Sequence, residues 1–319
     1  MILNILLVLA GFVLLVKGGD FLIDGAVAIA RRARLSAMVI GLTVVGFGTS
    51  TPELLVSAQA AWVGSSGIAI GNVVGSNIAN VALILGMTSL ICPLPSTKRM
   101  MRVDMPFMLL SMLLLIAAAW SGTIARWMGI VMVALLIGFV SWEVWQSRRN
   151  GAGNEEVGGA EPMALWKALL LVAVSIGGMI WGSDLLVQGA SGIARQLGEM
   201  WGVEPEQMER IIGLTVVAVG TSLPELFASV MAARKGETDM AVGNIIGSIT
   251  FNILCVIGIS SAITPIANAW SGFAVDYDLM MGLGLLLWFF LRTRNKLERW
   301  EGAVLLLAYV LFLGRTFWA

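Results

Sequence analysis

Histidine is absent from this 319-residue sequence, which excludes imidazole metal ligands, histidine-based catalysis and histidine proton relays. Cysteine is scarce: Cys92 and Cys255 lie in or beside apolar runs and suggest neither a disulfide framework nor a cysteine metal cluster. The formal net charge is zero, and no basic cluster is interleaved with aromatic residues, so we expect no nucleic-acid partner.

Charge of either sign is also scarce. Only 13% of the residues are charged, about half of the roughly 25% found in soluble domains, and 58% are hydrophobic. Uncharged runs near the ~20 residues needed to cross a bilayer recur along the chain. They predict an all-α membrane protein with ten transmembrane helices. These helices are expected near 2–29, 38–62, 69–92, 105–120, 126–146, 163–195, 211–233, 240–263, 274–292 and 300–317.

Two blocks of sequence each occur twice. Residues 41–54 (GLTVVGFGTSTPEL) match residues 213–226 (GLTVVAVGTSLPEL), and residues 71–80 match residues 243–252; both matches are 172 residues apart. Two blocks that share one spacing indicate a duplicated unit. The predicted organisation is a first five-helix repeat at 1–146, a cytoplasmic linker at 147–162 and a second five-helix repeat at 163–319.

The number of helices in each unit predicts its orientation. Five is odd, so the second repeat would start on the opposite side of the membrane and lie inverted. With the N-terminus outside, 15 of the 20 basic residues fall in cytoplasmic loops, as the positive-inside rule requires. We therefore expect a multi-pass protein of the plasma membrane (the inner membrane of a prokaryote), with both termini outside. Inverted repeats around a midplane site are typical of secondary transporters.

Two glutamates lie in the middle of predicted helices. Glu53 and Glu225 occupy equivalent places in the two repeats. A charged side chain at the bilayer centre costs about 2.5–3.5 kcal/mol, and such residues usually mark an ion pathway. The alternative is a structural ion pair, but Lys17 is the one basic residue within a predicted span and cannot neutralise both glutamates. We therefore predict an ion-binding site.

The prolines before these glutamates predict a break in each helix. Pro52 and Pro224 lack an N–H and would leave the carbonyls of Gly48 and Gly220 without a helical partner. Broken backbone at membrane depth is tolerated where it lines a polar cavity, and its carbonyls suit hard cations. Further hydroxyl and carbonyl oxygens would come from Thr49, Ser50, Thr221 and Ser222.

The second block of each repeat carries a polar stripe at helical spacing. The stripes are Asn72, Ser76 and Asn80 in the first copy, and Asn244, Ser248 and Asn252 in the second. Hydrogen bonding between helices is the alternative to ligation, since serine and asparagine often join membrane helices. For Asn72 and Asn244 both interpretations stay open. For the other four residues the pattern favours ligation.

Together these blocks resemble the alpha-repeats of the calcium/cation antiporter superfamily, most closely its prokaryotic sodium/calcium exchanger branch. The resemblance implies that Glu53 and Glu225 bind calcium with help from Thr49 and Thr221. It also implies transport of Ca2+ and Na+ without a cofactor, and sliding of the first and sixth helices across the site. The implied sodium sites pair Ser76 with Ala218, Thr221 and Ser222, and Ser248 with Gly46, Thr49 and Ser50.

The sequence departs from two branches of this superfamily. Potassium-dependent members resemble it but carry an aspartate at the position of Asn252, and proton-coupled members usually carry glutamate where Gly75 and Gly247 stand. We therefore predict sodium/calcium exchange, with a proton- or potassium-coupled cation antiporter as the alternative. A passive cation channel is a further rival, and an intramembrane enzyme is disfavoured because HExxH is absent. The expected partners are the lipid bilayer and small cations, and a monomer is compatible with the sequence.

Overall fold

The computed structural model describes residues 1–149, 163–200, 202, 218–267, 269–270 and 272–318. These residues are almost entirely helical, in agreement with the predicted class. The elements of the first half are α1 (Ile2–Ala33), α2 (Ala37–Ile40), η1 (Gly41–Val45), α3 (Gly46–Thr49), α4 (Thr51–Trp62), α5 (Ser66–Ala79), η2 (Asn80–Leu85), α6 (Gly86–Ile91), β1 (Leu94–Pro95), η3 (Met100–Asp104), α7 (Met105–Trp120), β2 (Thr123–Ile124) and α8 (Arg126–Arg149).

The second half repeats the order of the long helices and strands as far as it is described, but its residues 272–276, which correspond to η3, form a turn and the start of α15 instead of a π-helix. Its elements are α9 (Leu165–Met200), α11 (Ala218–Gly220), α12 (Leu223–Arg234), α13 (Thr238–Phe251), η6 (Asn252–Ile257), α14 (Gly258–Ile263), β3 (Ile266–Ala267), α15 (Ala274–Arg294), β4 (Lys296–Leu297) and α16 (Arg299–Trp318). Even the turns correspond: Gly64 and Gly236 have φ angles of 81° and 83° just after α4 and α12, a conformation that favours glycine.

Eight of the predicted spans are present in the described residues. Seven single helices are long and apolar enough to cross a membrane, and the bent pair Ala37–Thr49 and Thr51–Trp62 makes an eighth candidate. The predicted span 211–233 lies partly outside the described residues. The tenth predicted span is a helix, α16, but it is not among these apolar candidates.

The predicted linker begins too early. We expected the fifth helix to end at residue 146, but α8 continues to Arg149, so residues 147–149 are helical. Ser147 explains this extension in part, because its buried Oγ accepts a hydrogen bond from the backbone N–H of Ser36 at 3.0 Å. The remaining linker residues, 150–162, lie outside the described residues.

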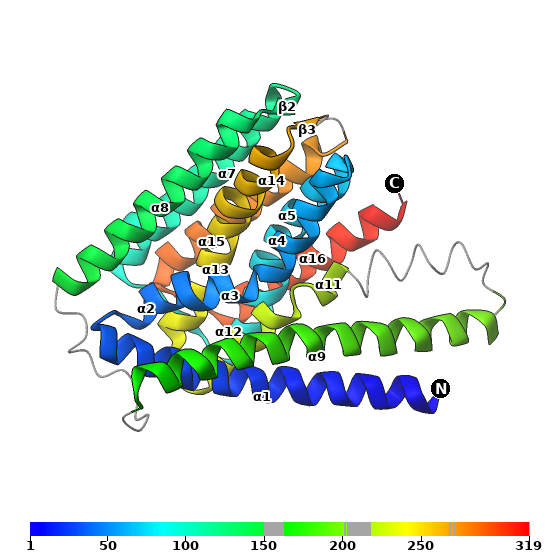
Figure 1. Ribbon diagram of the computed structural model, residues 1–319, viewed down its shortest axis with the longest axis horizontal. Helices are drawn as coiled ribbons and strands as arrows, with labels where there is room; N and C mark the ends of the chain where they lie inside the picture. Colours follow the sequence, from blue (N-terminus) through cyan, green and yellow to red (C-terminus); the bar gives the residue numbers. More distant parts are fainter. Residues whose placement is uncertain (150–162, 201, 203–217, 268, 271, 319) are drawn as a thin grey trace.

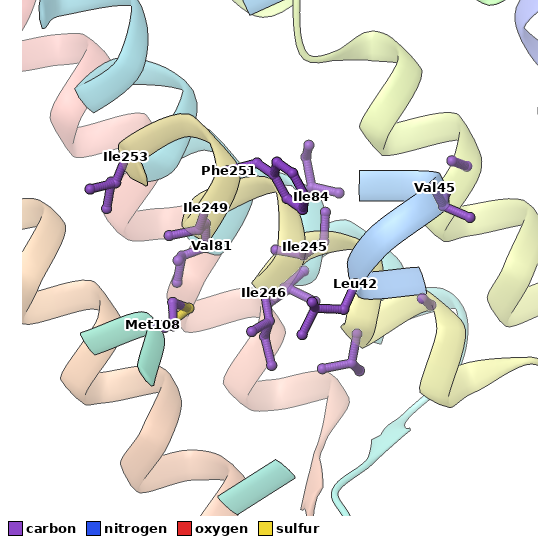
Figure 2. Close-up of a cluster of buried hydrophobic side chains, with 14 of the residues drawn as sticks. Leu42, Val45, Val81, Ile84, Met108, Ile245, Ile246, Ile249, Phe251 and Ile253 are labelled. Atoms are coloured by element: carbon purple, nitrogen blue, oxygen red, sulfur yellow. The ribbon is translucent and has the colours of Figure 1, made fainter. Parts of the chain in front are cut away.

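The centre of the molecule is the span formed by α13, η6 and α14 (Figure 1). In this span, 94% of the most apolar 18-residue stretch is buried, whereas in α1 only 22% of the corresponding stretch is buried. Figure 2 shows isoleucines of α13 close to Leu42 of η1, Val81 and Ile84 of η2, and Met108 of α7. Close approach depends on Gly247, where an added Cβ would lie 2.3 Å from the carbonyl oxygen of Leu42. The first and second repeats therefore interlock at the core.

The two longest helices, α1 and α9, lie side by side and antiparallel along one edge of the bundle (Figure 1). A Cβ added at Gly11 would lie 2.4 Å from the carbonyl oxygen of Gly182, so backbone packs directly on backbone there. Small residues at helix interfaces permit this approach in membranes. These helices correspond to the first and sixth predicted spans.

Two short antiparallel ladders join the repeats. Strand β1 pairs with β4, and β2 pairs with β3. Because β1 and β3 follow corresponding helices, as β2 and β4 do, each ladder joins one strand of the first repeat to the complementary strand of the second. The ladders tie α7–α8 and α15–α16 to the central spans.

Candidate functional site

The helix that carries Glu53 is broken where the sequence predicts. Helix α3 ends at Thr49, α4 begins at Thr51, and the two are bent by 48° about Ser50. Pro52 lies in the first turn of α4, where its missing N–H costs no helical hydrogen bond. In the second repeat, α11 ends at Gly220 and α12 begins at Leu223, again with a proline in the first turn.

These breaks bring the two glutamates into the protein interior. Glu53 is 0% exposed and Glu225 is 1% exposed, and their carboxylates are near enough to repel each other. No arginine or lysine within the described ranges forms an ion pair with either of them. A buried, unpaired charge is strongly unfavourable unless a counter-ion neutralises it. The pair therefore has the electrostatics of a cation site.

Each carboxylate uses one oxygen and leaves the other free. Ser76 Oγ donates to Glu53 Oε1 at 3.4 Å, and Ser50 Oγ donates to Glu225 Oε1 at 3.1 Å. Glu53 Oε2 and Glu225 Oε2 are buried and have no hydrogen-bond partner in the described part of the chain. Three further buried oxygens in this region lack partners among the described residues. They are Ser222 Oγ, Asn80 Oδ1 and Asn252 Oδ1.

Backbone carbonyls add to this oxygen-rich surface. The carbonyl of Gly46 accepts from Thr49 Oγ1 and from Ser248 Oγ, both at a long 3.4 Å. The carbonyl of Gly220, which Pro224 leaves without a helical donor, accepts instead from Ser183 Oγ of α9. No cluster of three or more acidic, cysteine or histidine side chains occurs in the described part of the chain. A metal held here would thus rely on hydroxyl, amide and carbonyl oxygens as well as the two carboxylates.

Asn72 and Asn244 hold neighbouring helices together. Asn72 Nδ2 donates to the carbonyl of Glu53 at 3.2 Å and to Ser57 Oγ at 2.9 Å. Asn244 Nδ2 makes the same pair of bonds in the second repeat, to the carbonyl of Glu225 at 3.3 Å and to Ser229 Oγ at 2.9 Å. Both amide groups therefore position the glutamate-bearing helices, one of the two roles that the sequence left open.

Three serines in these contacts were missed by sequence reasoning. Ser57 and Ser229 lie one helical turn after the glutamates and 172 residues apart, so the repeat itself contained the signal. Ser183 had no such signal. Asn77 was missed as well: it accepts a hydrogen bond from Asn252 Nδ2 at 3.1 Å, but its position in the second repeat is occupied by Ile249.

The hydrogen bonds do not obey the symmetry of the sequence. Ser76 contacts the glutamate of its own repeat, whereas the corresponding Ser248 contacts the Gly46 carbonyl of the other repeat. Ser50 contacts Glu225, whereas the hydroxyl of the corresponding Ser222 has no partner within the described ranges. Thr49 Oγ1 also approaches Asn244 Oδ1, at 3.3 Å. The two repeats thus occupy different local states in this conformation.

A cavity of about 380 Å³ adjoins this region between α4, α9 and α11. Thr221, which is half-buried, lies on its wall, as does the exposed Asp184 of α9. Ala218 begins α11 at the edge of the described segment. Most of the predicted ligands make hydrogen bonds within this region: Glu53, Glu225, Thr49, Ser50, Ser76, Ser248 and Gly46. Three others are buried and have an oxygen without a partner among the described residues: Ser222, Asn80 and Asn252.

Comparison with known proteins agrees with this architecture. The family described as sodium/calcium exchanger protein matches residues 3–145 and 167–318. The putative antiporter CaxA of Alkalimonas amylolytica is 35% identical over 97% of both chains. The sodium/calcium exchanger MaX1 of Methanosarcina acetivorans is 33% identical over 99% of both.

A solved structure shows the same likeness in three dimensions. The sodium-calcium exchanger NCX_Mj, soaked with zero Na+ and Ca2+, superposes with a TM-score of 0.80 at 31% identity over 98% of both chains. Together with the apolar spans, these matches make the protein a multi-pass membrane antiporter of small cations and not an enzyme. The chain therefore belongs to the sodium/calcium exchanger family.

Proposed function

We propose that this protein exchanges sodium for calcium across the plasma membrane by alternating access, at one midplane site built around Glu53 and Glu225. The observation that carries the proposal is the burial of two carboxylates, one from each repeat, without a basic partner among the described residues. Both face a region rich in oxygen acceptors. Calcium takes 6–8 oxygen ligands, and sodium also prefers oxygen.

Charge explains why the two cations would compete. Two carboxylates neutralise one Ca2+, so the calcium-loaded site is balanced, whereas several Na+ ions would leave it positive. Each ion needs oxygens that the other uses. Occupancy by one cation therefore requires departure of the other, and the sodium gradient supplies the free energy for calcium movement.

The flanking sodium sites would use hydroxyls and carbonyls. One site would combine Ser248 with Gly46, Thr49 and Ser50, and the Gly46 carbonyl already receives the Thr49 and Ser248 hydroxyls at 3.4 Å. Such long contacts would be exchanged readily for an ion. The other site would combine Ser76 with Ala218, Thr221 and Ser222, and the free Ser222 hydroxyl supports it.

Alternating access would come from α1 and α9. Both lie on one edge of the bundle, antiparallel to each other, as two inverted repeats with both termini outside would require (Figure 1). At Gly11 and Gly182 the two helices approach backbone to backbone, and among the three nearest atoms that an added Cβ would meet at each glycine, the side-chain atoms are the Cβ atoms of Leu186 and Leu14, so little side-chain bulk opposes sliding in the described part of this contact. The cavity beside Thr221 is then the entrance that this conformation presents.

Coupling to protons or potassium is the alternative. Both glutamates could carry protons, but the free oxygens of Asn80 and Asn252 are neutral amide groups that suit sodium without an added charge. Everted vesicles separate the two cases. Under an imposed sodium gradient we expect radioactive calcium uptake that neither a pH gradient nor a potassium gradient drives. Uptake driven by a pH gradient without sodium would overturn the proposal, and flux that trans-side sodium does not accelerate would indicate a channel.

A further inference from the structure

A second buried polar cluster lies away from the two glutamates, where η3 meets α8. Asp104, the last residue of η3, is 1% exposed, and Glu143 of α8 is 0% exposed. Arg99 donates a hydrogen bond to Glu143 Oε2 and forms an ion pair with it. Asp104 lies near enough to Glu143 and Arg99 to interact electrostatically with both. None of these residues belongs to the proposed transport site.

Four oxygens of this cluster, and the Nε of Arg99, are buried without a hydrogen-bond partner among the described residues. The oxygens are Asp104 Oδ1, Asp104 Oδ2, Glu143 Oε1 and Gln146 Oε1. Gln146 lies three residues after Glu143, so the two side chains leave α8 on the same face. All four atoms are acceptors, and two facing carboxylates contain no donor for each other. Buried acceptors of this kind need a donor or a cation.

The charge of the cluster is also incomplete. Two buried carboxylates face one guanidinium, which leaves one negative charge without a partner among the described residues. The second repeat shows the balanced version: Asp276, which is 172 residues after Asp104, pairs with Arg315 of α16 at 3.2 Å. In the first repeat a glutamate from α8 approaches the aspartate, so the neutralising charge must come from elsewhere.

We propose that Asp104, Glu143 and Gln146 bind one monovalent hard cation, sodium or potassium, at a site separate from the transport site. A single proton shared by the carboxylates would satisfy two of the four free oxygens, and the unpaired Nε–H of Arg99 could satisfy one more, whereas a cation can coordinate all four. The charge deficit is one, which matches a monovalent ion. The bound cation would join the start of α7 to the end of α8 and stabilise this part of the first repeat.

Thermal unfolding of the purified, full-length protein tests this site. The transport site is first disabled by the double substitution Glu53→Gln and Glu225→Gln, so that its ions do not contribute. N-methyl-D-glucamine chloride is then replaced by NaCl or KCl at constant ionic strength and neutral pH. We expect a saturable rise of several degrees in Tm, because an ion that binds the folded state stabilises it. The two salts show which ion the site prefers.

Adding Asp104→Asn should abolish the rise, whereas adding Asp276→Asn, which removes the corresponding charge of the second repeat, should leave it intact. If Asp104→Asn does not fold, Gln146→Leu replaces it and should move the midpoint of the rise to higher salt. An equal rise with and without the Asp104 and Gln146 substitutions would overturn the proposal. A Tm that follows pH alone, with no effect of either salt, would assign the site to a proton and overturn it as well. Neither outcome depends on which ions the transport site exchanges.

Discussion

The hydroxyl of Ser50 donates a hydrogen bond to Glu225 Oε1 at 3.1 Å, although the two residues belong to different repeats and are 175 positions apart. Ser50 is the residue at which the second span bends, and Glu225 lies in the first turn of α12. The bend of one repeat therefore supports the carboxylate of the other. An ion that binds an oxygen of either residue would therefore affect the position of both helices.

Neutralising either glutamate should stop calcium transport. Glu53→Gln or Glu225→Gln leaves one charge at a site that needs two, and removing one partner of a buried charge pair costs about 3–5 kcal/mol. Calcium affinity should therefore fall by about 10²- to 4 × 10³-fold, as measured by isothermal titration and by radioactive calcium uptake. Asp278→Asn, which removes an exposed carboxylate from α15, is the control and should transport normally. Normal uptake by either glutamine variant would show that the carboxylates are structural.

The asymmetry of the serines predicts unequal effects of equal substitutions. Ser50→Ala removes a hydrogen bond to a buried carboxylate, worth about 1.5–3 kcal/mol, whereas Ser222→Ala removes a hydroxyl that has no partner among the residues that the structure describes. Without sodium or calcium, Ser50→Ala should lower Tm clearly and Ser222→Ala should not. Calorimetry of the two ion-free variants measures this difference. Equal losses of stability would contradict the asymmetric arrangement.

Adding a charge at Asn252 should change cation preference. In Asn252→Asp the new carboxylate faces Asn77, whose amide can turn to donate to it, so the local hydrogen bond survives. The extra negative charge should favour binding of an additional monovalent cation. Calcium uptake measured against sodium and against potassium should then show a new dependence on potassium. Unchanged dependence on both ions, in a variant that expresses normally, would remove Asn252 from the binding region.

The contact between α1 and α9 should not tolerate a side chain at Gly11. In Gly11→Ala the new Cβ would lie 2.4 Å from the Gly182 carbonyl oxygen, so the helices must separate. We expect slower exchange and a lower Tm. Gly177→Ala, on α9, is the matched control because its Cβ would meet no described atom within 4 Å. In a helix interior that change should be neutral or stabilise by about 0.5–1 kcal/mol. Similar exchange rates for the two variants would refute a tight, mobile contact.

The sequence alone determined much of this molecule. Runs of apolar residues set the positions of the helices, because a membrane helix satisfies its backbone hydrogen bonds within one continuous segment, whose length can be read from the sequence. The duplicated blocks, at one spacing, identified Glu53 and Glu225 and the polar stripes around them. Pro52 and Pro224 located the breaks, since a proline removes a backbone hydrogen bond within its own helix. These are local or repeated signals, readable without knowing which helices are neighbours.

Tertiary structure alone decided which side chains meet. Contacts between helices distant in sequence decide three relationships. Ser50 contacts the glutamate of the other repeat, and Asn252 pairs with Asn77. Asp104 lies near a glutamate, whereas the corresponding Asp276 pairs with an arginine. Such contacts follow from how apolar and glycine surfaces pack, not from the spacing of residues along one helix. Equal sequences in two repeats therefore acquire unequal partners.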